Sequence, residues 1–187
     1  MSVRISNNTM EVFNPATGED LEQISMTTLQ DLNSILQKAQ AGAEKYNYSS
    51  FFRRQKLMTQ FRKGIVKRMD EFVDTICSET GKKPDEGLME VFISLEHIKQ
   101  TSHHLYEALG KRNRRSGILK TRKAWVEYEP LGVAGIISPW NYPLILAVSP
   151  LVEALLAGNT VVLKPSEHTP LTTQLLKRVW DESTERP

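Results

Sequence analysis

Residues Leu131 to Leu163 read LGVAGIISPWNYPLILAVSPLVEALLAGNTVVL, and Glu153 is the single charged residue among these 33. In a chain that is 25% charged, so long an apolar stretch must be buried, either in a bilayer or in a parallel sheet. Its first 22 residues are long enough to span a membrane. Three prolines argue against a span, because each removes a backbone donor and interrupts the helix that lipid requires. We therefore interpret the stretch as part of a buried sheet.

The stretch divides into a strand, a helix and a second strand. Gly132 to Ile137 is a short apolar run, the pattern of a strand buried on both faces. Leu144 to Ala157 has apolar residues at helical spacing; Pro150 predicts a late start or a kink, and Gly158 a stop. Thr160 to Leu163 is a second strand. This βαβ unit predicts an α/β fold, the N-terminal part of a doubly wound, Rossmann-like parallel sheet.

Polar residues follow each predicted strand. Ser138, Pro139, Trp140 and Asn141 come after the first strand, and the sequence from Lys164 to Glu167 comes after the second. In parallel sheets ligands bind beyond the carboxyl ends of the strands, and both turns lie at that edge. We expect an amide, a lysine and a carboxylate around one crevice.

Four segments carry a resemblance to one enzyme family. Glu129 to Pro143, with its Pro-Trp-Asn, and Gly158 to Glu167, with its Lys-Pro-Ser-Glu, are the specific ones. Asn14 to Glu19 and Glu79 to Lys82 are weaker matches, so the resemblance covers nearly the whole chain. These segments resemble the NAD(P)-dependent aldehyde dehydrogenase superfamily.

The resemblance implies a role for each residue at the predicted edge. Asn141 matches the asparagine whose side-chain amide stabilises the negative oxygen that forms when an aldehyde carbon is attacked. Lys164 and Glu167 match residues that contact the adenosine ribose of the dinucleotide. The other implied cofactor-binding residues, several of which line the cofactor cleft, are Ile137, Ser138, Pro139, Trp140 and Ser166.

The expected cofactor is NAD, and the expected substrate is an aldehyde. The carboxylate of Glu167 suits a free ribose diol and repels a 2′-phosphate, although Lys164 beside it can offset this repulsion and leaves NADP open. Tyr142 matches a position near the substrate tunnel. The Tyr-Pro after Asn141, with Pro150, resembles most the class-3 and coniferyl-aldehyde branch of the family.

Each of these residues also has an ordinary structural interpretation. Asn141 is a favoured N-cap residue and suits the start of the following helix. Trp140 fits core packing, and Lys164 and Glu167 fit an exposed turn. Glu167 also suits the first turn of the next helix, where negative charge is favourable.

The nucleophile that the family uses is not found in this sequence. The single cysteine, Cys77, precedes the cofactor segments and lies on an apolar helical face, which predicts a structural role. The sequence therefore resembles the truncated first part of an oxidoreductase, with the catalytic domain absent. We expect the chain alone to be inactive. We also expect it to aggregate readily, because the parallel sheet would have an open edge. The alternative is a non-catalytic relative that binds nucleotide weakly or pairs with another subunit. An open reading frame beyond the codon for Pro187 would favour the first interpretation.

We expect one incomplete dinucleotide-binding domain over residues 1–187. Residues 1–110 are predicted to form a hairpin between Met10 and Ser25 and a helical layer, including a helix capped by Thr28 and one from Ser50 to Gly81. Residues 111–129 form a basic connector and a strand, and residues 130–187 hold the βαβ unit and a last helix from about Pro170 to Asp181.

The remaining features suggest a cytoplasmic protein without metal or nucleic-acid partners. Seven of the 13 residues from Lys111 to Lys123 are basic, but no aromatic residue interleaves them, which favours a solvated connector over a nucleic-acid surface. The four histidines do not have metal-ligand spacing. One cysteine and no signal sequence suit a reducing compartment. The family resemblance implies a homo-oligomer, paired through the strand from Ala124 to Glu129.

Overall fold

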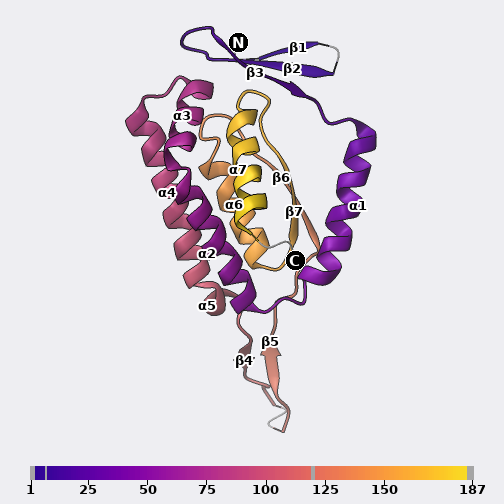
Figure 1. Cartoon of the computed structure of the whole chain (residues 1–187). Coiled ribbons are helices and arrows are strands. Elements are labelled where there is room, and N and C mark those ends of the chain that lie inside the picture. Colours follow the sequence, from indigo (N-terminus) through magenta and orange to yellow (C-terminus); the bar gives the residue numbers. More distant parts are fainter. Residues whose placement is uncertain (1–2, 7, 119–120, 185–187) are drawn as a thin grey trace.

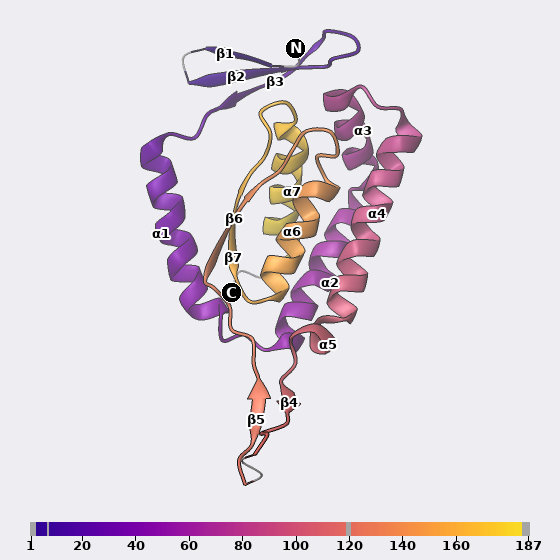
Figure 2. The same ribbon diagram turned by 180° about the vertical axis from the view of Figure 1, so that it is seen from behind.

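Two parallel strands have helices on both of their faces. The computed structural model describes residues 3–6, 8–118 and 121–184. Strand β6 (Val133–Ile137) pairs with β7 (Thr160–Lys164), and helix α6 (Ile145–Leu156) connects them. Helix α1 (Leu29–Tyr46) packs on one face of the pair and α6 on the other, as Figures 1 and 2 show from opposite sides. The predicted βαβ unit and α/β fold are confirmed.

A layer of helices precedes this unit in the chain and packs against it. The layer contains α2 (Phe51–Lys67), α3 (Met69–Thr80), α4 (Pro84–His103) and the short α5 (Leu105–Leu109). Helix α7 (Pro170–Ser183) packs on α2 and α3. The apolar core lies between this layer and helices α6 and α7, with fully buried side chains that include Phe61, Phe72, Ile76, Leu144, Val148 and Val179.

The apolar stretch is buried mainly through its helix. Leu144, Val148 and Val152 have no exposed surface, whereas Ile137 in β6 is 80% exposed. The prediction of a first strand buried on both faces is wrong, because β6 pairs only with β7 in the described part of the chain and α1 and α6 cover the two-stranded sheet incompletely. Within the described residues, no helix combines the length and the apolar character that crossing a membrane requires.

The helix predicted from Ser50 to Gly81 is two helices. The chain leaves helical geometry at Arg68, where φ is −116° and ψ is 26°, between α2 and α3. The Arg68 guanidinium binds Glu71 (2.8 Å) and Glu182 of α7 (2.7 Å), so contacts distant in sequence accompany this corner. Gly81 ends α3 with a left-handed φ of 71°, as the predicted stop requires.

Two antiparallel sheets lie at opposite ends of the βαβ unit. Strands β1 (Val3–Ser6), β2 (Thr9–Phe13) and β3 (Asp20–Ser25) form a sheet at the end where β6 and β7 finish (Figure 1). The predicted hairpin is confirmed, with β1 as an additional strand. At the other end, β4 (Arg112–Arg114) pairs with β5 (Ala124–Val126). Strand β4 lies within the predicted basic connector and is exposed along its length, and the sequence does not predict it as a strand.

Buried side chains of opposite charge hold the two ends of α6. At the N-terminal end, Glu90 of α4 accepts hydrogen bonds from the backbone N–H groups of Leu144 (2.8 Å) and Ile145 (3.3 Å). At the C-terminal end, Arg54 of α2 donates to the carbonyl of Leu156 (3.1 Å). A negative charge at the first turn and a positive charge at the last turn both complement the helix dipole.

Arg54 also joins α6 to the end of α1. Its guanidinium donates to the carbonyl of Asn47 (2.9 Å), and the hydroxyl of Tyr46 donates to the carbonyl of Leu155 (3.0 Å). Arg54 is only 5% exposed and has no carboxylate partner among the described residues, so carbonyl dipoles supply its counter-charge. Gly158 has a φ of 95°, and a Cβ there would lie 2.5 Å from the Arg54 guanidinium, which leaves room only for glycine.

Glu79 of α3 holds the N-terminal end of α7 in a similar way. Its carboxylate accepts hydrogen bonds from the backbone N–H groups of Leu171 and Thr172 and from the hydroxyl of Thr172 (2.6 Å). Burial raises the pKa of Glu79 to about 7, although these hydrogen bonds act in the opposite direction. The helical layer therefore supplies one carboxylate to the N-terminus of each helix of the βαβ region.

Replacement of Arg54 by methionine should lower the free energy of unfolding by about 3 kcal/mol, because it leaves buried carbonyl groups without their charged donor. Urea denaturation followed by circular dichroism measures this change. Arg53→Met is the matched control, since Arg53 is exposed on the same turn of α2, and it should cost less than about 0.5 kcal/mol. Equal losses in the two variants would contradict the role assigned to Arg54.

The raised pKa of Glu79 predicts that stability falls as pH rises. Between its ordinary pKa and about pH 7 the folded chain keeps a proton that the unfolded chain has lost, so the free energy of unfolding decreases through this window, by at most about 3 kcal/mol. Glu79→Gln should remove this slope between pH 5 and 7, measured by denaturation at a series of pH values. Glu44→Gln, on the exposed face of α1, should keep the slope.

Candidate functional site

The two polar turns meet at one edge of the parallel strands. The backbone N–H of Ser138, directly after β6, donates to the carbonyl of Lys164, the last residue of β7 (3.1 Å). Farther out, the rings of Trp140 and His168 lie edge to face with their centroids 6.4 Å apart. The prediction that these turns share the carboxyl edge of the sheet is confirmed.

The turn after β6 leaves the core and re-enters it within a few residues. Ser138 is buried, Trp140 and Asn141 are exposed, and Leu144 is fully buried again. The side chain of Asn141 makes no hydrogen bond to any other described residue. The interpretation of Asn141 as the cap of α6 is wrong, because Glu90 already accepts from the N–H groups there. The amide of Asn141 is thus available at the surface as a donor.

The turn after β7 places two opposite charges side by side. The ammonium group of Lys164 lies 3.5 Å from the carboxylate of Glu167 and donates to the carbonyl of Pro165 (3.1 Å). Ser166 is buried, and its hydroxyl accepts from the backbone N–H of His168 (3.2 Å). A hydrogen bond from its own backbone N–H lowers the pKa of Glu167, and the charges of Lys164 and His168 add to this effect. Glu167 is therefore ionised at neutral pH.

The ion pair between Lys164 and Glu167 is solvated, with more than half of each side chain exposed. Such pairs contribute at most about 1 kcal/mol, so hydroxyl groups of a ligand can compete with it. Ile137 and Pro139 expose apolar surface at the same edge. The surface thus combines apolar contacts with an anionic acceptor and a cationic donor.

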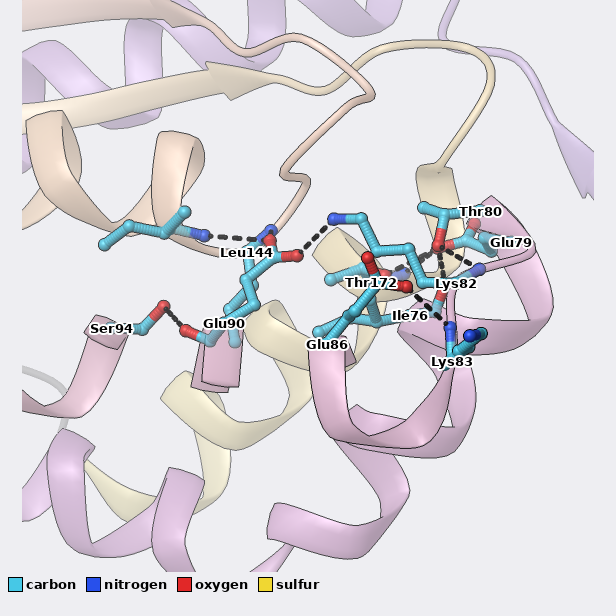
Figure 3. A network of polar contacts seen from close by, with 11 residues as sticks. Ile76, Glu79, Thr80, Lys82, Lys83, Glu86, Glu90, Ser94, Leu144 and Thr172 are labelled. Atoms are coloured by element: carbon cyan, nitrogen blue, oxygen red, sulfur yellow. Dashed lines mark hydrogen bonds and ion pairs between the residues drawn. The ribbon is translucent and has the colours of Figure 1, made fainter. Parts of the chain in front are cut away.

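Residues of the helical layer reach this edge, and the sequence did not identify them as part of the site. Glu90 contacts the start of α6, and its second carboxylate oxygen lies 2.8 Å from the ammonium group of Lys82 (Figure 3). That ammonium group also lies 3.8 Å from the ring centroid of Tyr142, the residue after Asn141. The only local signal for Glu90 is a carboxylate at helical spacing with the apolar residues Val91, Leu95 and Ile98 of the same helix.

Two other groups that could support chemistry have ordinary roles. Cys77 lies on α3 and not on either of the two turns, and burial raises the pKa of its thiol, which opposes formation of a nucleophilic thiolate. His97 contacts both Ser149 (3.1 Å) and Glu153 (3.5 Å) through Nε2, whereas a catalytic triad needs them on different ring nitrogens. Among the described residues, no group of His, Cys, Asp and Glu side chains is placed to hold a metal ion.

Comparison with known proteins identifies the family of this chain. The model of the aldehyde dehydrogenase family matches residues 3–185. A 2-hydroxymuconic semialdehyde dehydrogenase from Pseudomonas sp. is 32% identical in an alignment that covers 93% of this chain and 36% of the relative. A D-glyceraldehyde dehydrogenase (NADP(+)) from Picrophilus torridus is 29% identical, over 91% of this chain and 34% of the relative.

A solved structure of an aldehyde dehydrogenase has the same fold as this chain. A double mutant of betaine aldehyde dehydrogenase from Staphylococcus aureus, in complex with NAD+, superposes with a TM-score of 0.89 at 25% identity. The match covers 96% of this chain and 36% of that structure. The chain spans about a third of the length of the curated relatives described above. Because the family model matches nearly every residue and the fold agrees, this chain belongs to the aldehyde dehydrogenase family.

Proposed function

We propose that this chain supplies the ribose-binding surface and the oxyanion-stabilising amide of an enzyme that oxidises an aldehyde to a carboxylic acid with NAD(P)+. The meeting of the two polar turns at one sheet edge is the observation that carries this proposal. Family membership supports it, since relatives are named for aldehyde oxidation.

Lys164 and Glu167 are proposed to bind the adenosine ribose. An ionised carboxylate accepts hydrogen bonds from both hydroxyls of a ribose diol, and the neighbouring ammonium group donates to the same oxygens. Ile137, Pro139 and Trp140 supply the apolar surface beside them. Ser138 fixes its turn through its backbone N–H, and Ser166 fixes the other through its hydroxyl, which accepts from the N–H of His168. The low pKa of Glu167 favours NAD over NADP, because the carboxylate repels a 2′-phosphate.

The phosphate groups of the dinucleotide are not expected at α6 or α7. Free N–H groups at a helix N-terminus form a ready anion site. Here Glu90 and Glu79 accept hydrogen bonds from those N–H groups, so neither terminus has these donors free for a phosphate. This edge therefore suits a ribose better than a pyrophosphate.

Asn141 is proposed to stabilise the oxygen anion of the attacked aldehyde. Its exposed amide donates to a negative oxygen better than to a neutral carbonyl, which lowers the barrier rather than merely tightening substrate binding. The bound dinucleotide would supply the hydride acceptor. Cys77 is not proposed as the nucleophile, because burial on α3 raises the pKa of its thiol and opposes formation of the thiolate.

The projecting hairpin of β4 and β5 is proposed to pair with another subunit of a homo-oligomer. Trp125 on β5 is 48% exposed, and the ammonium group of Lys111 lies 3.9 Å from its ring centroid. A cytoplasmic location is also proposed, from the single cysteine. The aldehyde is left unspecified, since the names of the relatives point to chemically different substrates.

Calorimetric titration of the 187-residue chain tests the ribose surface. NAD should bind with a dissociation constant near 1 mM, about −4 kcal/mol, because the chain supplies only part of a dinucleotide site. Lys164→Met should weaken binding by about tenfold, as expected for loss of one charged hydrogen bond. Lys177→Met, which breaks a comparable exposed ion pair on α7, is the control and should bind as the unmodified chain does. Micromolar binding, or no effect of Lys164→Met, would contradict the assignment.

The role of Asn141 is tested in a chimera where this chain replaces the matching third of the S. aureus betaine aldehyde dehydrogenase. Asn141→Ala should lower kcat by about 100- to 1,000-fold with little change in KM for NAD, because the lost donor acts only on the charged oxygen. Asn33→Ala, on the exposed surface of α1, should leave kcat unchanged. An increase in KM for the aldehyde, with kcat unchanged, would show that Asn141 binds the substrate instead.

A further inference from the structure

We propose that Lys82 and Glu90 are positioning residues that hold the turn carrying Asn141 in its working geometry. This inference rests on the proposed oxyanion role of Asn141. Neither side chain touches Asn141 itself. Both contact residues that directly follow Asn141 in the chain: Tyr142, Leu144 and Ile145.

Glu90 fixes the point where the turn re-enters the core. It is 2% exposed, and one carboxylate oxygen accepts from the N–H groups of Leu144 (2.8 Å) and Ile145 (3.3 Å). The other oxygen lies 2.8 Å from the ammonium group of Lys82 (Figure 3). Both oxygens of this buried carboxylate therefore have partners, and the distance from α4 to the first turn of α6 is fixed.

Lys82 extends this restraint to the exposed part of the turn. Its ammonium group stands 3.8 Å from the ring centroid of Tyr142, a distance that gives a favourable cation–π contact. The backbone of Tyr142 accepts from the N–H of Leu146 in α6 (3.2 Å). The residue after Asn141 is thus held through both its ring and its carbonyl group.

The other side of the turn is held by β7. Ser138 donates to the carbonyl of Lys164, and the ring of Trp140 meets that of His168. Asn141 lies between these two anchored sides and is exposed. An oxyanion donor must be placed in advance of the reaction, and a displacement of about 1 Å can cost about 100-fold in rate. Because Asn141 makes no hydrogen bond of its own to other described residues, its position depends on its neighbours.

A purely structural role for the pair is the competing explanation. A buried ion pair is weak grounds for inferring a gain in stability, since apolar residues of the same volume often serve as well. What favours positioning is the direction of the side-chain contacts. One of the four joins Lys82 to Glu90, and the other three go to Tyr142, Leu144 and Ile145, in the turn and at the start of α6.

Side-chain signals of the turn in ¹H–¹⁵N spectra of the ¹⁵N-labelled 187-residue chain test the proposal. The reporters are the side-chain amide of Asn141, assigned with Asn141→Ala, and the indole N–H of Trp140, assigned with Trp140→Phe. Lys82→Met should shift or broaden both reporters and leave the indole signals of Trp125 and Trp180 in place. Lys82→Arg, which keeps the charge and the ring contact, should restore them.

Two further variants separate positioning from general stability. Glu90→Gln keeps an acceptor for α6 but removes the charge that holds Lys82, so it should move the same reporters. Lys83→Met is the matched control, because Lys83 directly follows Lys82 in the sequence and its side chain does not contact Glu90. This variant should move neither reporter.

The proposal is overturned if Lys82→Met and Glu90→Gln lower the melting temperature while both reporters stay in place. It is also overturned if Lys82→Arg moves them as far as Lys82→Met does. Should Lys82→Met fail to fold, the Glu90→Gln and Lys82→Arg spectra decide by the same criteria. No substrate is present in these measurements, so failure of the oxyanion role would show in the chimera kinetics and not here.

Discussion

Helix α6 is held at both ends by buried charges that belong to other helices. Glu90 supplies a carboxylate at the N-terminal end and Arg54 a guanidinium at the C-terminal end, each favourable for the helix dipole. The rest of the βαβ unit depends on this placement, because β6 leads into one end of α6 and β7 leaves from the other. The helical layer that precedes the sheet in sequence thereby determines where the edge of the sheet lies (Figure 1).

The same arrangement determines what the edge can bind. Carboxylates from the helical layer occupy the N-termini of both α6 and α7, so these helices do not offer the usual anion site of a dinucleotide-binding fold. What is left at the edge is an exposed amide on one turn and a lysine–glutamate pair on the other. These groups suit a developing oxyanion and a ribose diol, the two functions proposed for this part of an aldehyde dehydrogenase.

Local patterns in the sequence predict the βαβ unit and its polar edge well, because both depend on residues that are neighbours in the chain. The apolar runs around Gly135 and Val162 and the polar residues that end them give strands, helix and turns in the correct order.

Features that depend on contacts between residues distant in the chain are not predictable from such local patterns. Nothing around Glu90 or Arg54 indicates that they hold α6, and the break at Arg68 and the strand Arg112–Arg114 form with partners distant in the chain. Apolar composition overestimates the burial of a strand such as β6, because it does not reveal how many neighbouring strands pair with it.

The response of each backbone amide to NAD, followed in ¹H–¹⁵N spectra during a titration, tests the edge site most directly. Shifts should concentrate at two separate segments, Ile137 to Asn141 and Lys164 to His168, and the first turns of α6 and α7 should change little. The most informative contrary result is shifts in the basic groove between α2 and α7, which is lined by Lys63, Lys67 and Arg68. Such a pattern would show that simple charge attraction, and not the edge of the parallel strands, binds the dinucleotide.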